Sequence, residues 1–204
     1  MSRGGQSHPA EHPLRDTPER WPVHEVERIW DGTPFSVRRD TISAPHDPRE
    51  RFGRLVLEHP GAVIVLAVDD EERALVLHQY RHPATTRFVE LPAGLLDVPE
   101  EDPLEAARRE LQEEGLLLAD DWNHLLSVHP SPGFSSERME IYLATGLHEA
   151  PHRGEDFEVE HEEADMTTAW VPVDELLDGF LTGRLTDGPL GLAVMAYRLR
   201  HRYR

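Results

Sequence analysis

The apolar residues of this chain follow two different periods, which predict strands alternating with helices. Residues 62–68 and 74–80 are nearly continuous aliphatic and β-branched runs around an acidic turn, typical of two buried strands joined as a central hairpin. Shorter runs of the same kind predict further strands at residues 87–91, 122–129, 139–144 and 168–171. Apolar positions at helical spacing predict helices over residues 173–182 and 189–201. This order indicates an α/β sandwich with a mixed sheet.

The N-terminal part of the chain shows a weaker pattern. Residues 23–30 and 35–42 alternate as half-exposed strands around a turn, so we expect a small β element over residues 21–58 and the main domain over residues 59–204. Residues 1–20 are charged and rich in Pro and His, without the apolar stretch of a secretory signal. We therefore expect residues 1–20 to be disordered.

Residues 102–105 predict the start of a helix. Asp102 is a favoured N-cap, Pro103 fits the first helical position and Glu105 follows at the third, so a helix is predicted over residues 103–115. At about 100° per residue, Glu110, Glu113 and Glu114 share one narrow arc of this helix. They lie beside the apolar arc that should face the core.

This carboxylate cluster is unfavourable in isolation. Like charges three and four residues apart each cost a few tenths of a kcal/mol, and Glu113 and Glu114 lie at the helix end that disfavours negative charge. One interpretation is a solvated acidic face. The other is an all-oxygen site for Mg²⁺, or for Mn²⁺, that shares its ligands with substrate phosphates.

The amino-acid composition excludes several classes of binding partner. The chain has 39 acidic and 21 basic residues, and a net charge of −18 repels nucleic acids and anionic membranes. No apolar run is long enough to span a membrane. The absence of cysteine excludes disulfides and thiolate chemistry and is typical of a cytoplasmic protein.

The residues around the acidic helix resemble the signature box of the Nudix hydrolases. Matching positions are Glu101, Arg109, Glu110, Leu111, Glu113, Glu114 and Leu117. Two positions depart from the box. Gly94 is one residue too far from Arg109, which implies an insertion in residues 97–102. Leu116 stands where the box has its late glycine, and because Gly115 precedes it, we expect the helix end to be shifted.

Similarity extends from about residue 35 to about residue 192, towards the bacterial ADP-ribose pyrophosphatases. The shared segments are residues 79–81, 90–94, 131–137, 142–147 and 162–166. Pro132 lies 15 residues after Leu117, at the place where that family carries a proline that marks ADP-ribose preference. The resemblance implies a Nudix-type α/β/α sandwich. It also implies hydrolysis of ADP-ribose, a nucleoside diphosphate sugar, to AMP and ribose 5-phosphate.

The same resemblance implies roles for individual residues. Glu110 and Glu114 would be the main metal ligands, assisted by Glu113 and the carbonyl of Ala93, and Arg109 would orient the carboxylates. The general base would come from the acidic residues 160–165, where Glu163 is the candidate and Glu162 the alternative. The residues that would bind substrate are Arg81 (phosphate), Glu137 (ribose), Phe35 (stacking on adenine), Pro132 and Glu90.

Family members commonly form homodimers that exchange N-terminal strands, and the weak strands here fit that arrangement. Two alternative functions stay open. One is a Nudix hydrolase for another nucleotide sugar or for a dinucleotide. The other is a non-catalytic Nudix-like sensor that binds ADP-ribose, although the complete carboxylate set and the lack of a basic domain argue against it. A purely structural acidic domain does not explain the clustered charges.

Overall fold

The computed structural model describes residues 14–153 and 165–202, and two sheets form its main body. The first has the order β7 (Ala93–Leu95), β4 (Ala62–Ala67), β9 (Met139–Glu149) and β8 (Leu117–Val128). Within it β4 and β9 are parallel and the other pairs antiparallel, so the predicted mixed sheet is confirmed. The second sheet has the order β10 (Thr167–Pro172), β5 (Arg73–Arg81) and β6 (Thr86–Glu90).

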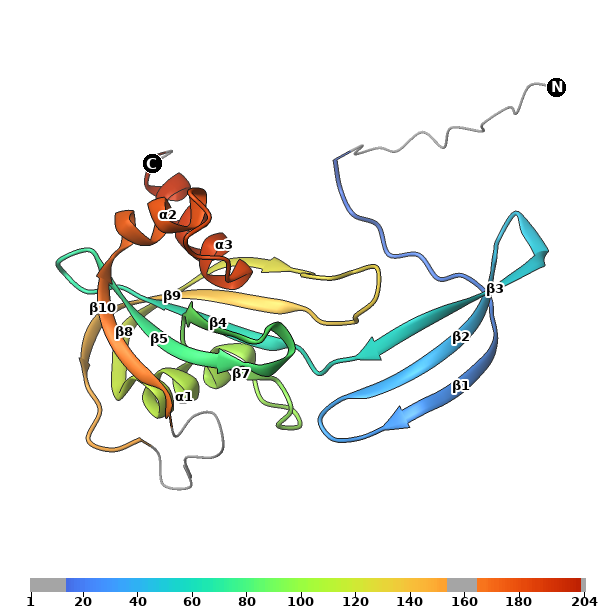
Figure 1. The fold of residues 1–204 in the computed structure, drawn as a ribbon, viewed down its shortest axis with the longest axis horizontal. Coiled ribbons are helices and arrows are strands. Elements are labelled where there is room, and N and C mark those ends of the chain that lie inside the picture. The colour runs from blue at the N-terminus through green and yellow to red at the C-terminus, as the bar shows by residue number, and fades with distance from the viewer. Residues whose placement is uncertain (1–13, 154–164, 203–204) are drawn as a thin grey trace.

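Helices cover the four-stranded sheet on both faces (Figure 1). Helix α1 (Pro103–Gly115) lies on one side, and α2 (Val173–Leu181) and α3 (Gly188–Arg202) lie on the other. A single 3₁₀ turn, η1 (His82–Ala84), links β5 to β6. None of the described helices is both long and apolar enough to cross a membrane.

Strand β4 is the centre of the core, because its successive side chains point to opposite layers. Val63 and Val65 pack in one cluster with Leu111 of α1. Ile64 and Leu66 belong to the other cluster, which includes residues of α2 and α3. A strand covered on both faces is expected to be apolar throughout, and the predicted sandwich is confirmed.

The predicted central hairpin is wrong. Strands β4 and β5 belong to different sheets and meet at a single bridge between Val68 and Ala74. The turn between them is tightened by Asp69, whose carboxylate accepts hydrogen bonds from the backbone N–H groups of Glu71 and Arg73. Strand β4 instead lies between β7 and β9 in its sheet, antiparallel to the first and parallel to the second.

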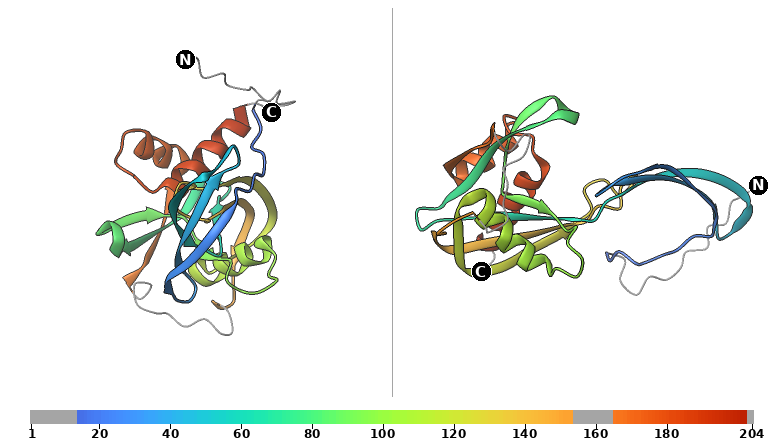
Figure 2. Two further views of the ribbon diagram at one scale, coloured as in Figure 1. Left: turned by 90° about the vertical axis from the view of Figure 1, so that its right-hand side faces the viewer. Right: turned by 90° about the horizontal axis from the view of Figure 1, so that it is seen from below.

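The N-terminal strands form a separate sheet that projects from the body as an arm (Figures 1 and 2). It consists of β1 (Val23–Asp31), β2 (Ser36–Ala44) and β3 (Asp47–Glu58), all antiparallel. The sequence predicted β1 and β2 but not β3, in which three arginines obscure the alternation. Residues 14–20 form no helix or strand, and residues 1–13 lie outside the described part.

Helix α1 begins as predicted and ends differently. The Asp102 carboxylate accepts a hydrogen bond from the N–H of Leu104, so the N-cap is confirmed. The helix end is not shifted, because Leu116 itself takes the left-handed conformation, with φ +55°, at the position of the box glycine. Gly115 has another role: a Cβ there would lie 2.7 Å from Leu75 of β5.

Candidate active site

Two acids of α1 lie directly against strand β7. The carboxylate of Glu114 accepts a hydrogen bond of 2.8 Å from the backbone N–H of Ala93. Glu110 fills the space beside Gly94, because a Cβ built on Gly94 would lie 1.9 Å from Glu110 Oε1. Both acids are buried. Only glycine at position 94 therefore leaves room for this carboxylate against the strand.

Arg109 gathers the other box acids into one network. It donates to the Glu110 carboxylate at 2.7 Å and to that of Glu113 at 3.2 Å. Two further bonds of 3.2 Å reach Glu101, whose alignment with the box is thereby supported. A guanidinium has five donors in a planar fork, so one arginine can orient three carboxylates. This geometry is the one expected of a residue that positions the acids.

The electrostatics of Glu110 are dominated by its burial. Desolvation raises the pKa of Glu110 to about 7, against the opposing effect of the Arg109 charge. The neighbouring carboxylates of Glu113 and Glu101 raise this pKa further. In turn, the pKa of Arg109 is raised by Glu101, Glu110 and Glu113 despite its own desolvation. The cluster thus still holds more negative charge than its one arginine neutralises.

The donor chemistry of this cluster fits a hard divalent cation. Across the described residues, no three Asp, Glu or His side chains are spaced to enclose a metal ion on their own. Mg²⁺ does not need such a cage, because it keeps several waters and binds through one or two carboxylates plus substrate phosphates. Two buried carboxylates of α1 against β7 satisfy that requirement.

A cavity of about 410 Å³ borders β7. Ala93 and Gly94 line it, so the two residues that touch the acids also form a wall of the cavity. Four substrate-binding residues predicted from the sequence meet here: Phe35, Arg81, Glu90 and Glu137. Pro132 is exposed and is not among the lining residues. Glu162 and Glu163 lie outside the described part of the chain, so the role of Glu163 as general base stays a prediction.

Arg81 is oriented by Glu90 at the edge of this cavity. Its Nε lies 3.1 Å from both carboxylate oxygens, and its Nη2 lies 2.7 Å from Oε2. Glu90 is buried, and its carboxylate raises the pKa of Arg81 against the effect of desolvation. The guanidinium is therefore held in one orientation and stays charged.

Among the lining residues with titratable side chains, sequence reasoning missed His59 and Asp187. Asp187 caps α3, since its Oδ2 accepts from the N–H of Leu190 at 2.8 Å, and burial raises its pKa to about 6. The sequence Asp187-Gly-Pro189 is a recognisable helix start and could have located this residue. His59 is one of 13 histidines without a pattern, so nothing in the sequence distinguished it.

Comparisons with known proteins agree with this geometry. The model of the NUDIX domain family matches residues 58–189. An ADP-ribose pyrophosphatase of Mycobacterium tuberculosis is 41% identical over 83% of this chain and 79% of its own length. A methanol dehydrogenase activator of Bacillus methanolicus is 32% identical over 86% and 91%. The crystal structure of an ADP compounds hydrolase superposes with a TM-score of 0.73 at 21% identity, covering 93% of this chain and 98% of that one.

Proposed function

The chain belongs to the Nudix hydrolase family, and we propose that it hydrolyses the diphosphate bond of ADP-ribose to give AMP and ribose 5-phosphate. The observation that carries this proposal is the double use of β7. Ala93 and Gly94 contact the two buried acids of α1, and the same two residues line a cavity with a fixed arginine and an aromatic ring. A diphosphate bound at β7 can therefore lie close to the acids while the adenine ring occupies the cavity.

Glu110 and Glu114 would hold the metal, with Glu113 and the Ala93 carbonyl assisting. Mg²⁺, or Mn²⁺ in its place, would neutralise the diphosphate and lower the pKa of a bound water. Arg109 would keep the carboxylates oriented between turnovers, as its bonds to Glu101, Glu110 and Glu113 indicate. Glu163 would accept the proton of the attacking water.

Arg81 would bind a phosphate oxygen through the edge that does not face Glu90. The described contacts of its guanidinium to Glu90 use Nε and Nη2, which leaves Nη1 for the substrate. Phe35 would stack on the adenine ring. Glu137 would accept a hydrogen bond from ribose, and Glu90 would act by fixing Arg81.

The arm supports a homodimer. All nine residues of β1 are exposed, including the large apolar side chains of Val26, Ile29 and Trp30. Exposed large apolar side chains on one strand support an interaction site there. The arm, residues 21–58, would exchange between two copies and bring substrate contacts to the partner. Light scattering on a size-exclusion column should give about twice the mass of 23.3 kDa, and a monomer would reject this part. The cytoplasmic location stays a prediction.

The test of the function is a substrate panel. The purified protein is incubated with Mg²⁺ and ADP-ribose, other ADP-sugars, dinucleoside polyphosphates or CMP derivatives, and the products are separated by chromatography. We expect AMP and ribose 5-phosphate, with kcat/KM highest for ADP-ribose. Faster hydrolysis of another diphosphate would favour the alternative hydrolase. Tight binding of ADP-ribose without turnover would favour the sensor.

A further inference from the structure

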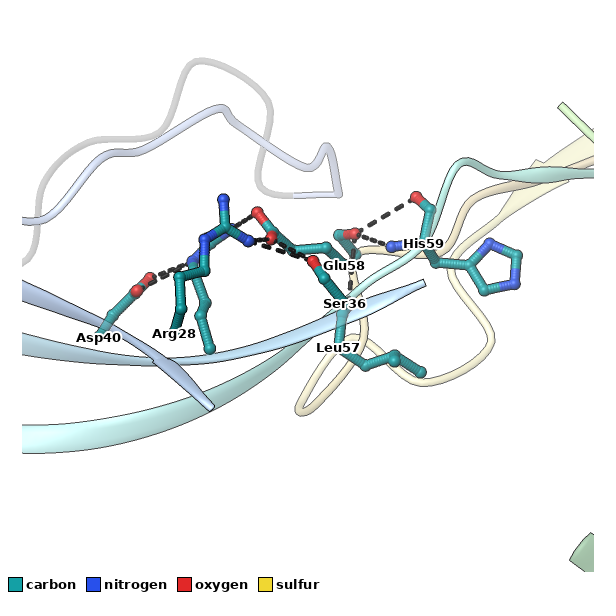
Figure 3. Close-up of polar contacts among 8 residues, drawn as sticks. Arg28, Ser36, Asp40, Leu57, Glu58 and His59 are labelled. Atoms are coloured by element: carbon teal, nitrogen blue, oxygen red, sulfur yellow. Dashed lines mark hydrogen bonds and ion pairs between the residues drawn. The ribbon is translucent and has the colours of Figure 1, made fainter. Parts of the chain in front are cut away.

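His59 lies at the junction between the arm and the body, where the backbone is held on both sides. Its N–H donates to Ser136 Oγ at 3.0 Å, and the N–H of Ser136 donates to the carbonyl of Leu57 at 3.0 Å. On the arm side, Glu58 binds Ser36 Oγ at 2.6 Å and pairs with Arg28 and Arg38. Figure 3 shows the His59 ring directed away from this cluster around Glu58.

The imidazole of His59 forms part of the cavity wall in a defined orientation. Its ring centroid lies 4.9 Å from that of Phe35, and its side chain is 11% exposed. Nδ1 accepts a hydrogen bond of 3.0 Å from the backbone N–H of Gly61. A backbone N–H is only a donor, so Nδ1 is the acceptor nitrogen, and the proton of the neutral ring is on Nε2.

The proton on Nε2 faces a carboxylate that is too distant for a direct hydrogen bond. Nε2 and Glu137 Oε1 are 3.8 Å apart, and both residues line the cavity. A hydroxyl group beside them can accept from Nε2–H and donate to the carboxylate at once. A phosphate oxygen can only accept from Nε2–H, and the negative charge of the carboxylate repels it. The pair therefore suits a neutral group that is both donor and acceptor.

We infer that His59 is a specificity-determining residue that binds, together with Glu137, one sugar hydroxyl of the substrate. This inference rests on the proposed function, because that function makes the substrate a nucleoside diphosphate sugar. The chain offers the hydroxyl an acceptor, the Glu137 carboxylate, and a donor, His59, which its contacts with Gly61 and Ser136 hold in place. Substrates without this hydroxyl leave both groups unpaired in a largely buried site, so they should be selected against.

The test compares ADP-ribose with two analogues, one lacking a hydroxyl on the adenosine ribose and one lacking it on the terminal ribose. We expect wild-type protein to prefer ADP-ribose over one analogue about tenfold or more. In His59→Phe, which keeps an aromatic ring beside Phe35, this ratio should fall towards one, through KM and not kcat. Glu137→Gln should lower the same ratio. His59→Gln, which retains an N–H donor, should restore part of it.

The matched control is His124→Phe. His124 also pairs with a carboxylate, Glu140, at 2.8 Å and with an aromatic ring, Tyr142, but it lies outside the cavity lining. Its substitution should leave the ratio unchanged. Kd values measured by calorimetry without metal give the preference for ADP-ribose over the analogue independently of turnover. A protein that binds ADP-ribose with this preference but does not hydrolyse it would contradict the proposed function and leave the inference on His59 intact. An unchanged ratio in both His59→Phe and Glu137→Gln, or wild-type protein that binds no analogue differently, overturns the inference.

Discussion

Strands β4 and β1 show how differently the two regions of this molecule are stabilised. All six residues of β4 are buried, whereas all nine residues of β1 are exposed. Helices cover β4 from both sides, so burial of its apolar side chains stabilises the body. Strand β1 has the ladder with β2 and surface ion pairs, which contribute little. Burial of the apolar core can therefore offset unfavourable charges in the body.

This difference explains where the acids are found. Glu110 and Glu114 are buried beside β7, where desolvation raises the pKa of Glu110. Such a group weakens folding at neutral pH unless a cation neutralises it. The apolar layers around β4 supply the stability that this arrangement requires. The arm supplies an aromatic side chain, Phe35, to the cavity, whereas the charged lining residues Arg81, Glu90, Glu137 and Asp187 come from the body.

The largest effect is expected from Glu114→Gln in the body. Glutamine still accepts the hydrogen bond from the N–H of Ala93, so the fold is kept while the charge is lost. We expect kcat/KM to fall roughly 10²–10³-fold, with an unchanged or slightly raised Tm. The matched control is Glu105→Gln, an exposed acid on the same helix paired with Arg108, which should keep full activity. A folded Glu114→Gln protein with wild-type turnover would remove this residue from the metal site.

Replacing a glycine by alanine should reduce activity in the body and have no effect in the arm. Gly94→Ala places a Cβ where the Glu110 carboxylate lies, and that flexible side chain must move away. We expect a loss of roughly 10–100-fold in kcat/KM and a change of at most about 1–2 kcal/mol in the free energy of unfolding. Gly53→Ala in the arm meets ordinary contacts of 3.6 Å with Arg39 and should change neither. Equal activities of the two variants would contradict the proposed placement of Glu110.

The buried Asp187 should make the stability of the body depend on pH. Burial raises its pKa to about 6 from an ordinary value of 3.8, so the folded state holds the proton more tightly than the unfolded state. The free energy of unfolding of the wild type should fall as pH rises from about 4 to 6, relative to Asp187→Asn. Above pH 6 the variant should be more stable by about 1–3 kcal/mol, since asparagine also caps α3. Urea titrations at pH 4 and pH 7.5 test this, and a gap independent of pH would refute it.

The smallest effect is expected at the end of α1. Leu116 adopts a left-handed backbone, which costs a residue with a side chain about 1–2 kcal/mol, and it is 38% exposed. Leu116→Gly should therefore stabilise the body by up to about 1 kcal/mol in chemical denaturation. Gly115→Ala should destabilise it, because its Cβ would collide with Leu75. A destabilised Leu116→Gly protein would show that the packing of this leucine outweighs the strain.

The sequence predicted those features that depend on neighbours along the chain. The cap at Asp102, the length of α1 and the acids grouped on it all follow from spacing within one helix. The partner of β4 did not follow, because pairing with β9 depends on residues more than 70 positions away. His59 was missed for a similar reason, since its role depends on Phe35 and Glu137, which are distant in sequence and which only the fold brings beside it.

The central claim is that the acids of α1 hold a divalent cation against the substrate diphosphate. The most direct measurement is a crystal structure with Mn²⁺ and a methylene-bridged analogue of ADP-ribose, in which anomalous scattering locates the ion. We predict an anomalous peak within coordination distance of the Glu110 and Glu114 carboxylates and of a phosphate oxygen. A peak elsewhere, or a bound analogue with no ion near these acids, would contradict the account.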